Sequence, residues 1–316
     1  MVSLEDVKKA QQEIRGTIHR TPILTSSLLN ERCGMEIFLK AEHLQKTGSF
    51  KIRGATNAVK QAVADGARSI TAASSGNHGQ AVAYIAGQLG VPAVIVVPED
   101  ANRAKVEAIK AYQAEVEYCG LTSADRIPRA KQLAEDNGGV YIPPYDHPAV
   151  IAGQGTIGLE ILEQLEDVTV IVVPVGGGGL IGGILSAVKR SKPEVRVIGV
   201  EPETADDTFQ SLRKGRITSI SDTSTIADGL RTSQPGDLTF PILKDKLDEL
   251  VLVSEEEIKE AFQFLLERTK QLVEPSGATG LAAVMAGKAG KANGKVAVVL
   301  SGGNVDLHQI PLFLKN

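Results

Sequence analysis

Residues 168–183 read VTVIVVPVGGGGLIGG, an apolar run that passes directly into four consecutive glycines. A run this apolar is typical of a parallel strand whose two faces are both covered. The glycines allow successive backbone N–H groups to converge on an anion, and the helix expected after them adds positive potential at its first turn. The pattern therefore predicts a strand–turn–helix unit whose turn holds a phosphate group.

This turn alone does not identify which phosphate-containing ligand binds. It lacks the lysine of the nucleotide-binding G-x-x-x-x-G-K-[ST] loop, which excludes that class. Residues 177–182 do match G-x-G-x-x-G, and Glu201 lies near the position, about twenty residues on, where dinucleotide-binding proteins carry an acid. An NAD-dependent Rossmann dehydrogenase is therefore one hypothesis.

Strand-like and helix-like segments alternate on both sides of the glycine turn. Before it, the strand candidates SITAAS, AVIVV, EVEYC and VYIPP are separated by helical segments of about ten residues. After it, VRVIGVE and VAVVLSGG continue the pattern, whereas residues 203–248 are rich in Ser, Thr, Asp and Gly and are expected to form loops. We therefore predict an α/β fold with two lobes, each a mostly parallel sheet flanked by helices, facing each other across a cleft.

Composition excludes several classes of function. The chain of 316 residues carries 34 basic and 38 acidic side chains, a net charge of −4, which argues against a nucleic-acid partner and a membrane-surface role. Cys33 and Cys119 form neither a disulfide framework nor a metal-ligand cluster. The polar first residues do not resemble a signal peptide, and no apolar stretch reaches the length of a membrane span. These features predict a cytoplasmic protein without a membrane partner.

Lys51 lies in TGSFKIRGA, among small residues at an expected turn into a helix. Taken alone, such a lysine is more often solvated or in contact with phosphate. A desolvated lysine, however, has a lowered pKa and can attack an aldehyde carbon. Together with a phosphate-binding turn, it would account for both ends of pyridoxal 5′-phosphate (PLP).

Seven motifs extend this observation along the chain: KTGSFKIRGA, SSGNHGQAVA, AVIAGQGTI, PVGGGGLIGG, VEPETADD, EPSGA and LSGGN. In this order they resemble the fold type II (tryptophan synthase β-like) PLP enzymes, and most of all the serine/threonine dehydratases and serine racemases. The resemblance covers about residues 15 to 310. It implies a discontinuous large domain, residues 1–65 and 147–316, around a small domain, residues 66–146.

The resemblance also assigns cofactor contacts. It implies that Lys51 holds PLP as a Schiff base and acts as the base at the substrate Cα, with Phe50 beside the ring. The remaining residues that it places at the cofactor are Asn77 at the phenolic oxygen, the phosphate-binding backbone of Gly176, Gly177, Gly178, Gly179 and Leu180, Glu274 near the ring, and Ser301 at the pyridine nitrogen. A serine there cannot protonate the ring, which favours loss of a β-substituent over a long-lived carbanion.

The segment SSGN is implied to bind the substrate carboxylate, through Ser74, Ser75, Gly76 and Asn77. The following residue, His78, is interpreted as a packing or hydrogen-bonding residue and not as a base. The predicted reaction is dehydration and deamination of L-threonine or L-serine to a 2-oxo acid and ammonia.

Two alternatives within the family stay open. Ser75 matches the position that serves as the second acid/base of serine racemases, so racemisation or dual activity is an alternative. Tyr145, in contrast, replaces an asparagine associated with animal racemases and favours a dehydratase. Threo-3-hydroxyaspartate is a further candidate substrate.

The motif VEPETADD gives a candidate metal site. The resemblance implies that Glu201, the carbonyl group of Ala205 and Asp207 bind Mg²⁺, or Mn²⁺ or Ca²⁺, together with water. Without an ion, the same segment would be a plain acidic loop. The resemblance further implies a homodimer, and the few residues after LSGGN lead us to expect no appended regulatory domain.

Overall fold

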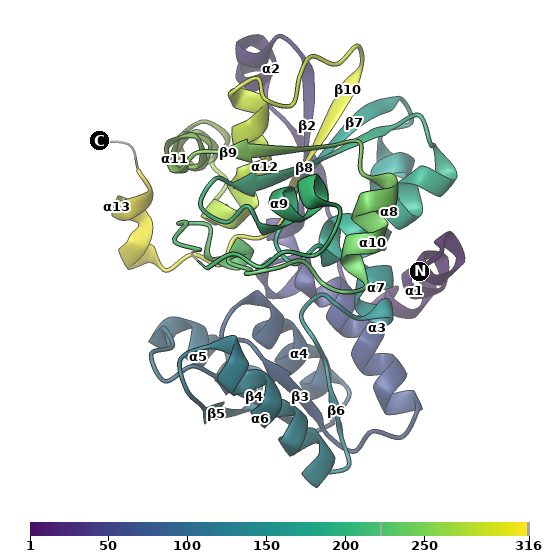
Figure 1. The fold of residues 1–316 in the computed structure, drawn as a ribbon, viewed down its shortest axis with the longest axis vertical. Coiled ribbons are helices and arrows are strands. Elements are labelled where there is room, and N and C mark those ends of the chain that lie inside the picture. The colour runs from purple at the N-terminus through teal and green to yellow at the C-terminus, as the bar shows by residue number, and fades with distance from the viewer. Residues whose placement is uncertain (222, 315–316) are drawn as a thin grey trace.

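The computed structural model describes residues 1–221 and 223–314 and has an α/β fold with two separate sheets (Figure 1). The larger sheet has six strands in the order β1-β2-β10-β7-β8-β9. Its strands are β1 (Ile23–Thr25), β2 (Glu36–Ala41), β7 (Val168–Pro174), β8 (Arg196–Pro202), β9 (Glu249–Val253) and β10 (Lys295–Leu300). All neighbours pair in parallel except β1 and β2.

The smaller sheet has four parallel strands in the order β5-β4-β3-β6. They are β3 (Ile70–Ala73), β4 (Ala93–Val97), β5 (Glu115–Tyr118) and β6 (Val140–Tyr141). The predicted fold class, two mostly parallel sheets flanked by helices, is therefore confirmed.

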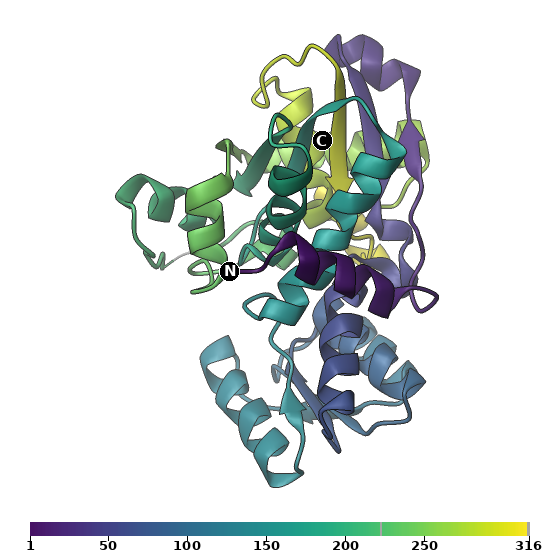
Figure 2. The ribbon, with the colours of Figure 1, turned by 90° about the vertical axis from the view of Figure 1, so that its right-hand side faces the viewer.

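Helices cover both sheets (Figures 1 and 2). On the larger sheet they are α1 (Leu4–Ile14), α2 (Ser27–Cys33), α7 (Pro148–Gln164), α8 (Gly179–Ser191), α9 (Asp207–Lys214), α10 (Thr239–Lys246), α11 (Glu255–Phe264), α12 (Pro275–Met285) and α13 (Ile310–Phe313). Around the smaller sheet lie α3 (Lys51–Ala64), α4 (Asn77–Gln88), α5 (Arg103–Ala111) and α6 (Ser123–Asp136). Among the described residues, none of these helices is both long enough and apolar enough to cross a lipid bilayer.

The strand β7 has six buried residues of its seven, because apolar clusters pack on both faces of the larger sheet. Alternate residues of β7 face opposite clusters: Val170 and Val172 join one, and Ile171 and Val173 the other. This arrangement explains the continuous apolar run in the sequence.

Helix α3 connects the two lobes. Its residues Ile52, Ala55, Ala58 and Val59 belong to the apolar core of the smaller sheet. Its opposite side packs closely on α7, which in turn lies against α8 and the larger sheet. Because Lys51 is the first residue of α3, the expected reactive lysine lies at the junction of the lobes.

The prediction of loops over residues 203–248 is partly wrong, because the structure forms α9 and α10 there. Phe240, Ile242 and Leu243 of α10 are buried, so tertiary packing stabilises a helix in a segment of weak local preference. Helix α11 ends at Phe264 and continues as a π-helical turn, Leu265–Thr269.

Candidate active site

Lys51 lies at the amino-terminal end of α3, in a partly buried position. Its Nζ donates a hydrogen bond of 2.8 Å to the carbonyl oxygen of Pro144 and lies 5.2 Å from the centroid of the Phe50 ring. Burial lowers the pKa of Lys51 to about 8, although the nearby Glu274 opposes this effect. None of the ion pairs among the described residues includes Lys51. About a tenth of the amine is therefore neutral at pH 7, far more than for an ordinary lysine, and only this neutral form is a nucleophile.

The glycine turn leads into α8. Gly178 has a φ of +87° and caps the helix, whose first residue is Gly179. A Cβ atom on Gly178 would lie 2.8 Å from the side chain of Thr239, and one on Gly177 would lie 2.5 Å from the ring of Tyr145. The turn therefore requires glycine for its backbone conformation and for close packing.

Tyr145 and Pro144 lie between the glycine turn and Lys51, in the loop that follows β6. The ring of Tyr145 packs on Gly177, and the hydroxyl of Thr239 donates a hydrogen bond of 2.7 Å to the carbonyl oxygen of Gly177. Sequence reasoning considered Tyr145 only as a mark of the dehydratases and assigned no role to Thr239. No local pattern could have indicated either contact, because both join segments far apart in the chain.

The SSGN segment forms the turn between β3 and α4. Gly76 is the N-cap residue of α4 and Asn77 its first residue, so the side chain of Asn77 does not cap the helix. The hydroxyl of Ser74 accepts a hydrogen bond of 3.3 Å from the N–H group of Gly76, and Ser75 is partly buried. No side chain of the described residues caps α4, so the first-turn N–H groups of this helix are free of a capping side chain at the segment predicted to bind the substrate carboxylate.

Asn77 lies at the centre of a polar chain. Its Nδ2 donates a hydrogen bond of 2.7 Å to Oε1 of Glu274, and its Oδ1 accepts one of 2.7 Å from Asn304. Asn304 also donates to the carbonyl oxygen of Thr47 at 2.8 Å. Burial, and then Asp228, raise the pKa of Glu274 to about 8. Two expected cofactor residues, Asn77 and Glu274, are thus in direct contact, and Asn304 of the LSGGN motif joins them.

Ser301 follows β10, beside the segment that precedes Lys51. Its carbonyl oxygen accepts a hydrogen bond of 3.0 Å from the N–H group of Phe50, and Gly302 forms a β-bridge with Ser49. The structure therefore brings the LSGGN, EPSGA, SSGNHG and KTGSFK motifs together.

His78 is buried behind this site. Its Nε2 lies 2.8 Å from the carbonyl oxygen of Ile142. Burial, with a smaller effect of Lys51, lowers the pKa of His78 to about 3. The ring is therefore neutral and in contact with the backbone, which agrees with the packing interpretation.

These residues fit the expected cofactor, PLP. The site combines an anion-binding turn, an amine of lowered pKa and polar side chains from four motifs. In addition, the buried hydroxyl groups of Thr47 and Ser49 have no hydrogen-bond partner within the part of the chain that the structure describes. Unsatisfied buried groups of this kind are costly in a protein interior and are common where a ligand binds.

The residues of the candidate metal site lie at the end of β8 and the start of α9. Glu201, Ala205 and Asp207 are fully buried. The Glu201 carboxylate accepts hydrogen bonds from the N–H groups of Thr208 and Phe209, at 3.1 and 2.9 Å. Burial and the nearby Asp207 raise the pKa of Glu201 well above its usual value, and burial raises that of Asp207 to about 7.

Two carboxylates and one carbonyl group make a small ligand set. No group of three or more His, Cys, Asp or Glu side chains with metal-binding geometry occurs over residues 1–221 and 223–314. Water would have to complete the coordination of Mg²⁺, which usually retains several waters in proteins.

The dinucleotide hypothesis fails on the position of Glu201. Its carboxylate is fully buried and bonded to the first turn of α9, so it does not reach a ribose beside the glycine turn. The match of residues 177–182 to G-x-G-x-x-G is therefore incidental.

Comparisons with known proteins lead to the same family. The sequence pattern of the family described as "Pyridoxal-phosphate dependent enzyme" matches residues 14–302. An L-threonine ammonia-lyase of Thermotoga maritima is 47% identical over 98% of this chain and 77% of its own length. Human serine racemase is 47% identical over 97% of this chain and 92% of its own length.

Solved structures agree with these sequence relatives. Maize serine racemase is 38% identical and superimposes with a TM-score of 0.94, covering 98% of this chain and 96% of the maize chain. The match to the family pattern spans nearly all of the motifs that form the site. This chain is a member of the pyridoxal-phosphate dependent enzyme family.

Proposed function

We propose that this enzyme catalyses the PLP-dependent β-elimination of L-threonine or L-serine, giving a 2-oxo acid and ammonia. The observation that carries the proposal is Lys51, an amine of lowered pKa whose Nζ donates to the carbonyl oxygen of Pro144 and forms no ion pair among the described residues. Relatives named L-threonine ammonia-lyase and serine racemase support this substrate class.

Separate groups of residues are proposed to bind the cofactor and the substrate. Bound PLP supplies an electron sink for the charge that develops at the substrate Cα. The backbone of Gly176–Gly179 and Leu180 would hold its phosphate, and Phe50, Asn77, Glu274 and Ser301 would hold its ring; the turn before α8 and the hydrogen bond between Asn77 and Glu274 support these roles. Ser74, Ser75, Gly76 and Asn77 orient the substrate carboxylate at the amino-terminal end of α4.

Lys51 then moves the proton at Cα. Its neutral amine accepts this proton on one face of the substrate, and departure of the β-hydroxyl group as water follows. The unsaturated amine that is released hydrolyses to the 2-oxo acid and ammonia. The lowered pKa of Lys51 allows its amine to act as a base near neutral pH.

Racemisation of serine is the second candidate function. It requires a proton donor and acceptor on the face opposite Lys51, and Ser75 supplies a partly buried hydroxyl in the SSGN turn. The dehydratase stays the main candidate, because Tyr145 stands where the resemblance places an asparagine in animal racemases, and threo-3-hydroxyaspartate is the remaining candidate substrate.

Four further features belong to the proposal. Mg²⁺, or Mn²⁺ or Ca²⁺, binds at Glu201, Ala205 and Asp207, where it relieves the repulsion between two buried carboxylates. The domains are residues 1–65 with 147–316 and residues 66–146, and the two separate sheets support this division. The homodimer and the cytoplasmic location stay predictions from the sequence.

The decisive experiment measures turnover and cofactor attachment in the same preparation. We expect formation of 2-oxo acid from L-threonine and L-serine, followed together with any D-serine. Borohydride reduction and peptide mapping should then find the cofactor on Lys51, and Lys51→Ala should abolish turnover. A label on Lys40 or Lys46 would refute the assignment.

A further inference from the structure

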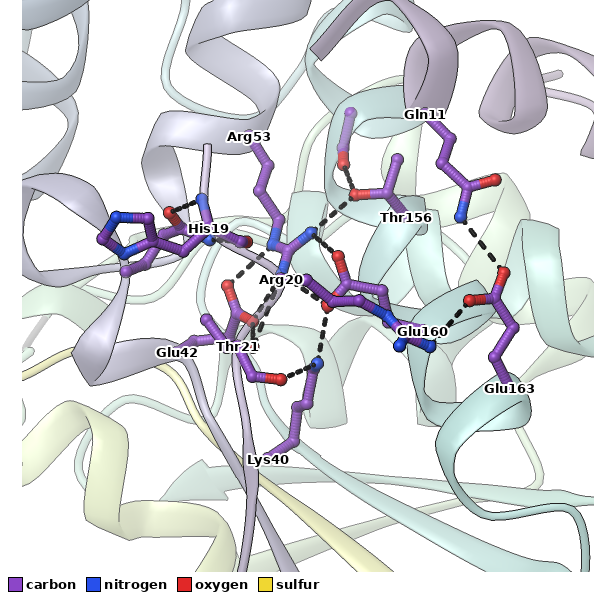
Figure 3. A network of polar contacts seen from close by, with 12 residues as sticks. Gln11, His19, Arg20, Thr21, Lys40, Glu42, Arg53, Thr156, Glu160 and Glu163 are labelled. Carbon is purple, nitrogen blue, oxygen red and sulfur yellow. Dashed lines mark hydrogen bonds and ion pairs between the residues drawn. The ribbon is translucent and has the colours of Figure 1, made fainter. Parts of the chain in front are cut away.

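Four charged side chains that the proposed function does not use are buried together (Figure 3). This buried quartet consists of Lys40, Glu42, Arg53 and Glu160, with exposed fractions of 0, 0, 0 and 6%. Its members come from β2, the segment after β2, α3 and α7. Charges this deeply buried are retained only with good geometry, so their arrangement requires an explanation.

Arg53 lies at the centre of the quartet and contacts both carboxylates. Its Nε and Nη2 each donate to Glu42 at 2.8 Å, in a two-pronged pair. Its Nη1 and Nη2 donate to the two oxygens of Glu160 at 2.7 and 2.9 Å. The planar guanidinium group therefore joins α3 to α7 and to the segment after β2 at once.

Lys40 contacts only one of the two carboxylates. Its Nζ donates to Glu160 at 2.6 Å, to the carbonyl oxygen of Thr21 at 2.9 Å and to Gln164 at 2.9 Å. These groups belong to α7 and to the segment before β1. Lys40 therefore contributes charge to the quartet, and none of its hydrogen bonds among the described residues goes to α3.

Further contacts hold the first turns of α3 against α7. The N–H group of Gly54 donates a hydrogen bond of 3.2 Å to Gln154. A Cβ atom on Gly153 would lie 2.6 Å from the Cα atom of Gly54, so the two helices touch through their backbones. Asn57 Nδ2 donates to the carbonyl oxygen of Ala149 at 2.8 Å.

The other face of α3 packs in the core of the smaller sheet, through Ile52, Ala55 and Val59. Helix α3 is thus shared between the lobes. Its first residue is Lys51, and the N–H group of Arg53 donates to the carbonyl oxygen of Phe50 at 3.0 Å. A shift of this first turn would move the Lys51 amine relative to the glycine turn of the large lobe.

We propose that Arg53 is a positioning residue of this enzyme. Its two-pronged contacts to Glu42 and Glu160, called the fork below, hold the first turn of α3, and with it Lys51, against α7 and the segment after β2. The inference rests on the role of Lys51 in the proposed function. The fork stays charged: burial alone would lower the pKa of Arg53, but Glu42 and Glu160 outweigh burial and hold it above its usual value. A lysine at this position would keep the charge but could not make the two-pronged pair.

The test compares two substitutions within the same quartet. Arg53→Lys keeps the positive charge but removes the two-pronged guanidinium contacts to Glu42 and Glu160. The matched control Lys40→Met removes a buried cation whose hydrogen bonds go to Thr21, Glu160 and Gln164 and not to α3. The pKa of Lys51 is measured in the full-length chain after PLP has been removed with hydroxylamine, from the pH dependence of trinitrobenzenesulfonate labelling followed by peptide mapping.

We expect Arg53→Lys to raise the pH midpoint of Lys51 labelling by about one unit, because the first turn of α3 is no longer held in place and water reaches the amine. The neutral fraction of Lys51 near neutral pH then falls about tenfold. The midpoint of Lys40→Met should stay at the parent value even where its melting temperature falls. Equal shifts in both variants, or no shift in Arg53→Lys, would overturn the proposal and leave Arg53 with a purely stabilising role.

A second variant covers the case in which Arg53→Lys does not fold. Thr156→Val removes the 3.1 Å contact between Arg53 Nη1 and the Thr156 hydroxyl, together with the 2.7 Å hydrogen bond from that hydroxyl to the carbonyl oxygen of Gly153. This variant should move the Lys51 midpoint in the same direction by a smaller amount. An unchanged midpoint there would count against the proposal. Borohydride mapping of the parent holoenzyme tests the role of Lys51 separately, so failure of the proposed function is distinguishable from failure of this inference.

Discussion

Lys51 illustrates how surroundings determine the chemistry of a single residue. Its nearest polar partner is the neutral carbonyl group of Pro144, and burial lowers the pKa of its amine to about 8. The protonated amine cannot attack an aldehyde, so only the form that prevails above this pKa reacts.

The rate of cofactor capture should therefore depend on pH. For the full-length chain freed of PLP, we expect the rate of visible-absorbance recovery after adding PLP to rise with pH, with a midpoint near 8. The sign follows from the lowered pKa, since the neutral fraction of Lys51 grows as pH rises through it. A midpoint near 10.5, the ordinary value for lysine, would contradict the geometry of the site.

Ser75 separates the two candidate activities. If its hydroxyl serves the face opposite Lys51, Ser75→Ala should abolish formation of D-serine and elimination from D-serine. Elimination from L-serine should persist, because Lys51 still works from its own face. Carboxylate binding should weaken only modestly, since loss of a hydrogen bond to a charged group costs about 1.5–3 kcal/mol.

Chiral chromatography of the products, with keto acid followed in parallel, checks this prediction. Ser74→Ala is the matched control in the same turn, and it should retain racemisation. If the parent enzyme neither makes nor consumes D-serine, Ser75 is a substrate-binding hydroxyl and the enzyme is a plain dehydratase.

Among the elements, the turn before α8 depends most strictly on glycine. Gly178→Ala would place a Cβ atom 2.8 Å from Thr239 at a φ of +87°, so the turn should distort and the affinity for PLP should fall by about tenfold or more. Gly182→Ala is the matched control one turn into the helix. There the nearest atom to the new methyl group is 3.7 Å away, so PLP affinity should be unchanged. Equilibrium titration by absorbance compares them, and equal affinities would contradict the role of the turn.

The junction of β8 and α9 buries two carboxyl groups, Glu201 and Asp207, and hydrogen bonds from Thr208, Phe209 and Thr232 partly offset their repulsion. A bound cation would relieve this repulsion and stabilise the fold. Chelation should therefore lower both melting temperature and activity, Mg²⁺ or Mn²⁺ should restore them, and Glu201→Gln should abolish the response.

Glu203→Gln is the control, because its exposed carboxylate lies in the same segment and forms a long ion pair of 3.7 Å with Lys288. This variant should respond to chelation and Mg²⁺ as the parent does. A melting temperature that ignores chelator, with no metal found by elemental analysis, would reduce the segment to an acidic loop.

At the scale of the whole molecule, a buried ion pair and an exposed one should contribute differently to the free energy of unfolding. Lys40→Met leaves Glu160 with one cation in a buried site, so we expect a loss of about 3–5 kcal/mol in the free energy of unfolding. Arg20→Met breaks an exposed pair with Glu163, one turn along α7, and should cost less than about 1 kcal/mol. Urea unfolding measures both, and equal losses would show that the buried quartet contributes no more than a surface pair.

The sequence by itself determined the features that depend on neighbouring residues. The apolar run of β7 and the glycines after it predict a buried strand and an anion-binding turn, because burial on both faces and positive φ leave local marks. The order of seven motifs indicated the PLP enzyme family. The sequence did not predict α10, because its local helix preference is weak. This helix is stabilised by the burial of Phe240 and Leu243 in the core, which a local pattern does not contain.

Only the tertiary structure decided which groups meet. Asn77 and Glu274 are 197 residues apart in the chain, and Lys51 and Pro144 are 93 apart, yet each pair is in hydrogen-bond contact. The lowered pKa of Lys51 and the pairing of Arg53 with two carboxylates are likewise properties of burial. Contact and burial depend on how two lobes pack around α3, and no short stretch of sequence contains that information.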